Sequence, residues 1–80
     1  MDLNKFYLLE RTHVPGGIRE RLVADPKIQK DPSKIQGMEF DNPFVAKEYA
    51  QNMARISSKT GCSGTIFIKR RGQIFGQVNF

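Results

Sequence analysis

The chain has one cysteine, no long apolar run and, after Glu48, no acidic residue at all. The single cysteine, Cys62, excludes an intramolecular disulfide framework and favours a reducing, intracellular setting. No apolar run approaches the roughly 18–20 residues that a membrane span requires. The N-terminus also shows no apolar signal-peptide segment. We therefore expect a cytoplasmic protein that has no membrane partner.

Residues that commonly perform catalysis or bind metals are also scarce. The single histidine, His13, and Cys62 cannot supply a closed zinc site, which usually needs four such ligands. Cys62 follows a predicted helix C-terminus, where the helix dipole opposes a thiolate. The glycine-rich run 61–65 leads from a helix to a strand, the reverse of the order in a P-loop. We expect no catalytic site, metal, cofactor or small-molecule substrate, and an enzyme centred on Cys62 and His13 is the third alternative.

The length and composition predict one small domain over residues 1–80. The chain has 80 residues, of which 39% are hydrophobic and 26% charged, and this balance argues against wholesale disorder. A chain of this size buries only about 60–65% of the surface that its unfolded form exposes. The core is therefore expected to be thin.

The first third of the chain predicts a β-hairpin. Lys5–Arg11 is rich in aromatic and apolar residues, which is typical of a strand. Residues 13–17 contain Pro-Gly-Gly, the chemistry of a turn. Ile18–Ala24 reads as the second strand, whose polar face would carry Arg19 and Arg21.

The middle of the chain predicts one amphipathic helix. Asp41 or Asn42 is a suitable N-cap, and Pro43 suits the first helical position. Lys59 favours the negative end of the helix dipole, and Gly61 suits a left-handed cap. The apolar positions that recur every three or four residues are Val45, Ala46, Tyr49, Ala50, Met53, Ala54 and Ile56 or Ser57.

The end of the chain predicts a second hairpin, with strands Ser63–Arg70 and Gln73–Phe80 around a type I′ turn at Arg71-Gly72. A two-residue loop of this type places Phe67 opposite Gly76. Both faces of the hairpin are partly apolar, so alternation alone leaves the buried face open. The pattern favours burial of the face that carries Phe67, Val78 and Phe80.

The predicted fold class is α+β, in the order β-β-loop-α-β-β, where the loop spans residues 25–37. Two Asp-Pro pairs within this loop disfavour regular structure. One amphipathic helix can bury its apolar stripe against one face of an antiparallel sheet of four to five strands. The other face of the sheet must then be solvated or occupied by a partner.

Positive charge is concentrated in the last two-fifths of the chain. Thirteen Lys and Arg against eight Asp and Glu give a net charge of +5. Residues 1–48 contain eight acids and eight bases and sum to zero, so the whole excess lies in residues 49–80. A positive lobe speeds encounter with anionic partners, although a basic surface can also simply keep a small protein soluble.

The charge predicts a binding surface centred on Lys69, Arg70 and Arg71, with Phe75 beside them. This cluster could dock on an acidic surface of a protein or nucleoprotein complex, because Arg gives bidentate contacts to carboxylates. It could also bind nucleic acid directly, if Phe75 stacks on a base while the cations hold phosphates. The residues that would extend the surface are Arg19, Arg21, Arg55 and Lys59.

The segment from Ala46-Lys47 through Cys62-Ser63-Gly64-Thr65-Ile66-Phe67-Ile68-Lys69 resembles part of the small phage-encoded anti-CRISPR proteins of the type I-F group. In those proteins, too, an Ala-Lys-containing helix leads to a Cys, a Gly-Thr-apolar strand and a closing hairpin. The resemblance covers about 30 residues, and the Asp-Pro segment has no counterpart in it. It implies a non-enzymatic inhibitor, in the host cytoplasm, that covers the nucleic-acid-binding face of a bacterial defence complex.

Overall fold

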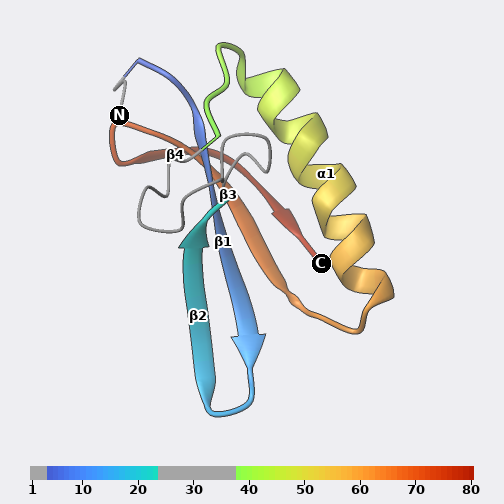
Figure 1. The fold of residues 1–80 in the computed structure, drawn as a ribbon. Helices are drawn as coiled ribbons and strands as arrows, with labels where there is room; N and C mark the ends of the chain where they lie inside the picture. Colours follow the sequence, from blue (N-terminus) through green and yellow to red (C-terminus); the bar gives the residue numbers. More distant parts are fainter. Residues whose placement is uncertain (1–3, 24–37) are drawn as a thin grey trace, which may run out of the picture.

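The computed structural model describes residues 4–23 and 38–80, and the predicted loop at residues 25–37 lies outside them. The described residues form two β-hairpins joined through one helix (Figure 1). In chain order the elements are β1 (Tyr7–Val14), β2 (Gly17–Leu22), α1 (Pro43–Lys59), β3 (Gly64–Arg70) and β4 (Gln73–Asn79).

The four strands form one antiparallel sheet in the order β2-β1-β3-β4. Each hairpin is a pair of neighbours, and β1 pairs with β3 to join the two hairpins at the centre. Helix α1 lies across β4, β3 and β1, and makes no contact with β2. The predicted α+β architecture is confirmed, with four strands.

Local chemistry fixes the start of α1. The side chain of Asn42 accepts a hydrogen bond from the backbone N–H of Phe44 at 2.8 Å, and Pro43 occupies the first turn. Of the two predicted caps, Asn42 is therefore the one used. The buried stripe of the helix is formed by Ala46, Ala50 and Ala54.

The apolar stripe of α1 is narrower than its spacing predicts. Val45 is 53% exposed and Ile56 is 66% exposed, whereas the three alanines are at most 5% exposed. Because alanine side chains are short, the helix axis can lie close to the sheet along this one line. Residues on the flanks of the stripe then project past the sheet into solvent, and the prediction that Val45 belongs to the apolar stripe is wrong. Of the two alternatives at its end, Ile56 is exposed and Ser57 is half-buried.

The core lies between α1 and one face of the two central strands. Leu8 on β1 and Ile66 and Ile68 on β3 are the largest fully buried side chains. Phe6, just before β1, is 4% exposed and pairs with Phe40 in an isolated antiparallel bridge. The remaining apolar residues packed against this core are Val23, Tyr49, Met53, Val78 and Phe80.

The register of the second hairpin differs from the predicted one by one residue. Phe67 lies opposite Gln77, and Ile68 lies opposite Gly76. The cause is a register shift between Ile68 and Lys69, where β4 carries one extra residue, as in a β-bulge. A shift of one residue exchanges the two faces of a strand. Ile66 and Ile68 therefore face α1, and the prediction that Phe67 is buried there is wrong.

The first hairpin is tighter than predicted. β1 continues past Arg11 to Val14, because His13 and Val14 still pair with Ile18 and Gly17 of β2. The connection is thus reduced to Pro15 and Gly16, and Gly16 has a φ of 91°. Pro followed by a glycine with positive φ is the combination that a type II turn requires.

Candidate binding surface

The turn between β3 and β4 places three consecutive cations at one end of the sheet. Arg71 and Gly72 have φ values of 52° and 77°, the two positive values that a type I′ turn requires. Lys69 lies opposite Tyr7 of β1, on the face of the sheet away from α1, which we call the open face. Successive residues of a strand alternate in direction, so the side chain of Arg70 lies on the helix-covered face.

Two aromatic rings hold the guanidinium of Arg70. Its Cζ atom lies 4.7 Å from the ring centroid of Phe6 and 4.8 Å from that of Phe75. The two rings are themselves in edge contact, 5.3 Å apart at an interplanar angle of 88°. Each cation–π contact of this kind contributes about 0.5–1 kcal/mol at an exposed site. The base of the hairpin is thus tied to the residues that precede β1.

Three of the five described Asp and Glu side chains form ion pairs, and all three pair with cations outside the β3–β4 hairpin. Ion pairs join Lys5 to Asp41, Arg11 to Glu20 at 3.2 Å and Arg21 to Glu10 at 3.3 Å. Within residues 4–23 and 38–80, no carboxylate forms an ion pair with a cation of the segment 69–71.

One neutral side chain, Asn4, and one carboxylate, Glu39, lie near this hairpin. Arg71 donates to the side-chain oxygen of Asn4. Glu39 accepts a hydrogen bond at 3.2 Å from Tyr7, the cross-strand neighbour of Lys69, without forming an ion pair with that lysine. Among the described residues, no carboxylate therefore neutralises residues 69–71 through an ion pair.

Apolar surface lies beside these cations. A hollow of about 610 Å³ on the open face is lined by Tyr7, Leu9 and Leu22 together with residues 69–72. Ile74 and Phe75 are 58% and 45% exposed. The hairpin thus combines charge with exposed apolar groups, a composition found at interfaces.

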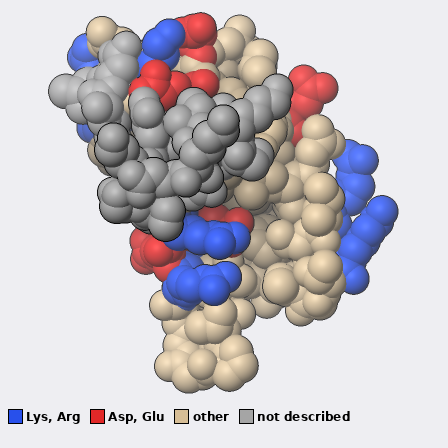
Figure 2. Space-filling view, in the orientation of Figure 1, with Lys and Arg blue, Asp and Glu red and all other residues tan. Residues whose placement is uncertain are grey.

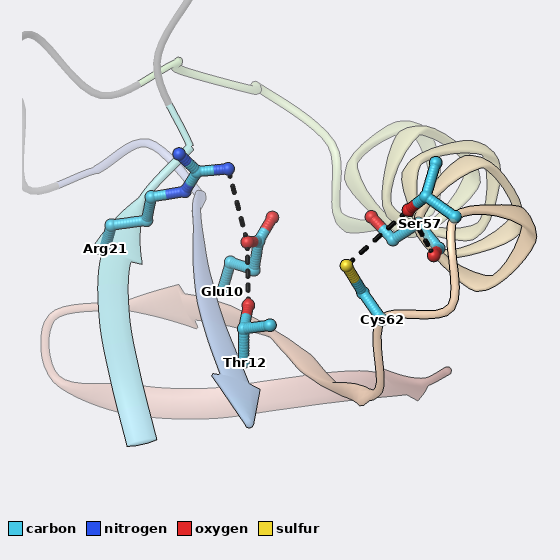
Figure 3. A network of polar contacts seen from close by, with 6 residues as sticks. Glu10, Thr12, Arg21, Ser57 and Cys62 are labelled. Carbon is cyan, nitrogen blue, oxygen red and sulfur yellow. Dashed lines mark hydrogen bonds and ion pairs between the residues drawn. The ribbon is translucent and has the colours of Figure 1, made fainter. Parts of the chain in front are cut away.

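Arg19 and Arg21 lie on β2, at the far edge of the sheet from β4. The carboxylate of Glu10, which is only 4% exposed, accepts a hydrogen bond from the Thr12 hydroxyl at 2.9 Å and pairs with Arg21 (Figure 3). A buried carboxylate is costly without such partners. Arg21 therefore neutralises a buried acid within the protein.

We expect Arg21→Ala to lower the free energy of unfolding by about 1–2 kcal/mol, because it removes a partner of buried Glu10. Chemical denaturation measures the effect, and Arg19→Ala is the control, since Arg19 is exposed and on the same strand. The cost of Arg21→Ala should shrink in a Glu10→Gln background. Equal costs for Arg21→Ala and Arg19→Ala would contradict this role for Arg21.

Arg55 and Lys59 lie near the C-terminal end of α1 and border a hollow of about 560 Å³ between the helix and residues 78–80. This end of β4 is separated from the 71–72 turn by about 20 Å, at roughly 3.3 Å per strand residue. In the space-filling view, uncharged surface separates the Lys and Arg side chains in the middle of the molecule from those on the right (Figure 2).

The eight predicted binding residues thus occupy three places. Lys69, Arg70, Arg71 and Phe75 are together at the hairpin, which we call the hairpin site. Arg19 and Arg21 lie on β2, and Arg55 and Lys59 on α1. Residues 69–71 and Phe75 lie together because they are close in the sequence. A single surface of all eight residues would require a fold that brings β2 and α1 to the 71–72 turn.

Two residues that contact the hairpin site were not predicted. Asn4 and Phe6 contact Arg71 and Arg70 across more than sixty positions of the chain. Neither residue belongs to a local motif. Only a prediction that β1 pairs with β3 would have placed Asn4 and Phe6 beside this turn.

The candidate catalytic residues His13 and Cys62 lie on neighbouring segments, because the backbone N–H of His13 donates to the carbonyl oxygen of Ser63 at 3.0 Å. In residues 4–23 and 38–80, no group of three or more His, Cys, Asp and Glu gathers as a metal site requires. His13 is exposed on the β1–β2 hairpin, while Cys62 follows α1 and accepts a contact from the Thr60 hydroxyl at 3.5 Å. Helix α1, the helix of the described residues, is too short and too polar to cross a membrane.

Comparison of the chain with protein-family models, with curated proteins and with solved structures found no match. The resemblance to anti-CRISPR proteins therefore stays a prediction.

Proposed function

We propose that this is a non-enzymatic binding protein that docks through its hairpin site on an anionic surface of a larger partner. The observation that carries the proposal is the charge of the hairpin. Arg11 and Arg21 of the described sheet pair with carboxylates of the chain itself, whereas exposed Arg19 and the three consecutive cations of the segment 69–71 form no ion pair with a described carboxylate. Unpaired cations beside exposed apolar groups suit the capture of an acidic protein surface.

The anchoring of Arg70 further supports docking by this hairpin. Because the guanidinium lies against Phe6 and Phe75, the turn is held to the body of the protein. Less conformational freedom is then lost when the hairpin binds. A preorganised cationic turn favours a specific partner over loose electrostatic association.

The partner that we favour is a bacterial nucleoprotein complex, on which the protein would dock at an acidic region and, as an inhibitor, block the access of nucleic acid. The resemblance to phage-encoded anti-CRISPR proteins points the same way. The partner's docking region is expected to be acidic, since arginine pairs well with carboxylates.

Direct binding of single-stranded nucleic acid is the alternative, and the aromatic contacts disfavour it. Base stacking needs a free ring face. Arg70 lies over the ring of Phe75 at 4.8 Å, and Arg11 lies over the ring of Phe67 at 5.1 Å. A base would have to displace an arginine or use the second face of each ring.

The test is affinity capture from a bacterial lysate with the wild type and the double variant Lys69→Gln/Arg71→Gln. We expect the double variant to retain less than a tenth of the partner that the wild type captures. The control is Lys47→Glu, on the exposed side of α1. Both variants have a net charge of +3, because the wild type has +5 and each change removes two units.

Three results would contradict the proposal. The wild type could retain no specific partner, the double variant could capture as much as the wild type, or Lys47→Glu could lose as much as the double variant. Random DNA and RNA are tested separately in a gel shift at low salt. A shift that weakens steeply with salt would favour the alternative, and no shift would exclude it.

A further inference from the structure

The two edges of the sheet differ in charge. The edge strand β2 contains three consecutive charged residues at 19–21, which is a common protection against pairing with another chain. The other edge strand, β4, has the sequence QIFGQVN and contains no charged residue and no proline. Its one irregularity is the shift near Phe75, so residues 76–80 remain regular.

The free backbone groups of β4 can be placed from the ladder. Phe80 and Gly64 exchange both backbone hydrogen bonds, at 2.9 Å each. Hydrogen-bonded and non-hydrogen-bonded pairs alternate in an antiparallel ladder. The N–H and C=O groups of Gln77 and Asn79 therefore point away from β3, and no described strand pairs with them.

A groove runs beside this free edge. It lies between α1 and β4, with Ala54, Val78 and Phe80 as its apolar lining and Arg55 and Lys59 at its rim. Figure 1 shows the end of β4 lying alongside the helix. Neither cation forms an ion pair with a described carboxylate; Arg55 contacts the side-chain oxygen of Asn52 at 3.2 Å.

We propose that an extended acidic peptide of a partner protein adds to β4 as a fifth, antiparallel strand, with its carboxylates in the groove toward Arg55 and Lys59. Strand addition beside a helix is a known mode of peptide recognition, in which backbone bonds give affinity and pockets for alternate side chains give specificity. This site is separate from the hairpin site and does not depend on it.

The geometry assigns the two faces of the added strand. Peptide residues opposite Gln77 and Asn79 exchange backbone hydrogen bonds with them, and their side chains lie on the open face. Residues opposite Val78 direct their side chains into the groove, where an acid meets the two cations. A peptide that alternates Glu with a β-branched residue satisfies both requirements.

The probe is the capped peptide Ser-Val-Glu-Val-Glu-Val-Ser, titrated into the ¹⁵N-labelled full chain and followed by amide chemical shifts. We expect saturable shifts that are largest at Gln77 and Asn79. Replacing both Glu with Gln should weaken binding about tenfold. N-methylation of the Val amides should abolish it, while N-methylation of the Glu amides, which point away from β4, should have a smaller effect.

The protein variant is Arg55→Gln/Lys59→Gln, and we expect it to weaken binding at least tenfold. The control is again Lys47→Glu, which has the same net charge of +3 (wild type +5, less two) and lies on the same helix away from the groove lining. We expect it to bind within about twofold of the wild type. Unchanged amide spectra outside the groove show that each variant is folded.

The proposal is overturned if binding is undetectable at millimolar peptide, if N-methylation of Val is harmless, or if both variants lose affinity equally. Shifts concentrated at residues 69–72 would also overturn it. In that case the acidic peptide would bind the hairpin site, and the proposed function would be supported while the β4 groove would not.

Discussion

Gly64→Ala should lower the free energy of unfolding by about 3 kcal/mol or more, at the upper end of the cost of overpacking. Gly64 begins β3 and lies opposite Thr12. A Cβ atom at this position would overlap the backbone oxygen of Arg11 and lie 3.0 Å from the Cα of Thr12. Backbone atoms cannot rotate away as a side chain can, so β1 and β3 would have to separate.

Gly76→Ala is the matched control for this prediction. A Cβ there would lie 3.3 Å from the Cδ1 atom of Ile68, the end of a flexible side chain. We expect a cost of about 1 kcal/mol, since the isoleucine can adjust. Urea denaturation of both variants measures the difference, and equal costs would show that β1 and β3 are not in close contact at Gly64.

Ile68→Ala should cost about 3 kcal/mol, and Phe67→Ala about half of that or less, although phenylalanine is the larger residue. Ile68 is 2% exposed and faces α1, so its truncation leaves a cavity in the core. Phe67 is half-buried on the open face, where its recorded ring contact is with Arg11 at 5.1 Å.

Thermal and urea denaturation of these two variants test which face of β3 packs on the helix. If the face predicted from the sequence packed on α1, Phe67→Ala would lower the free energy of unfolding more than Ile68→Ala does. That result would also contradict the bulge in β4, because the bulge is what exchanges the two faces.

Local signals in the sequence were sufficient to predict the helix, the strands and their order along the chain. The Asn42-Pro43 start of α1, the Arg71-Gly72 turn and the Pro15-Gly16 turn each depend on residues close together in the chain, and all three are observed. Such signals act through backbone preferences of a few neighbouring residues. They predicted one helix and a sheet of four to five strands, and the described residues form one helix and four strands.

The face of the second hairpin that packs on α1 could not be predicted, because it depends on a single extra residue in β4. Nothing in the alternation of residues 64–80 marks the bulge, because both faces are partly apolar. A bulge forms where packing against other elements compensates for the lost ladder bond. Here Phe75 meets Phe6, a contact that exists only after β1 and β3 have paired.

The binding surface was predicted only in part for a similar reason. Net charge locates an excess of cations in the chain but does not say which carboxylates approach them. Glu10 and Glu20 lie in the first hairpin, and both pair with arginines of that same hairpin rather than with cations near the C-terminus. The acid-free end of the chain was therefore left unneutralised in the described part of the structure.

The most direct test of the proposed function is amide hydrogen exchange of the protein alone and in complex with its captured partner. The turn amides of Arg71 and Gly72 are exposed and should exchange rapidly in the free protein. Docking through the hairpin site predicts that the complex slows exchange at residues 69–75 and leaves residues 17–21 of β2 unchanged. Protection at β2 with none at the hairpin would contradict the account.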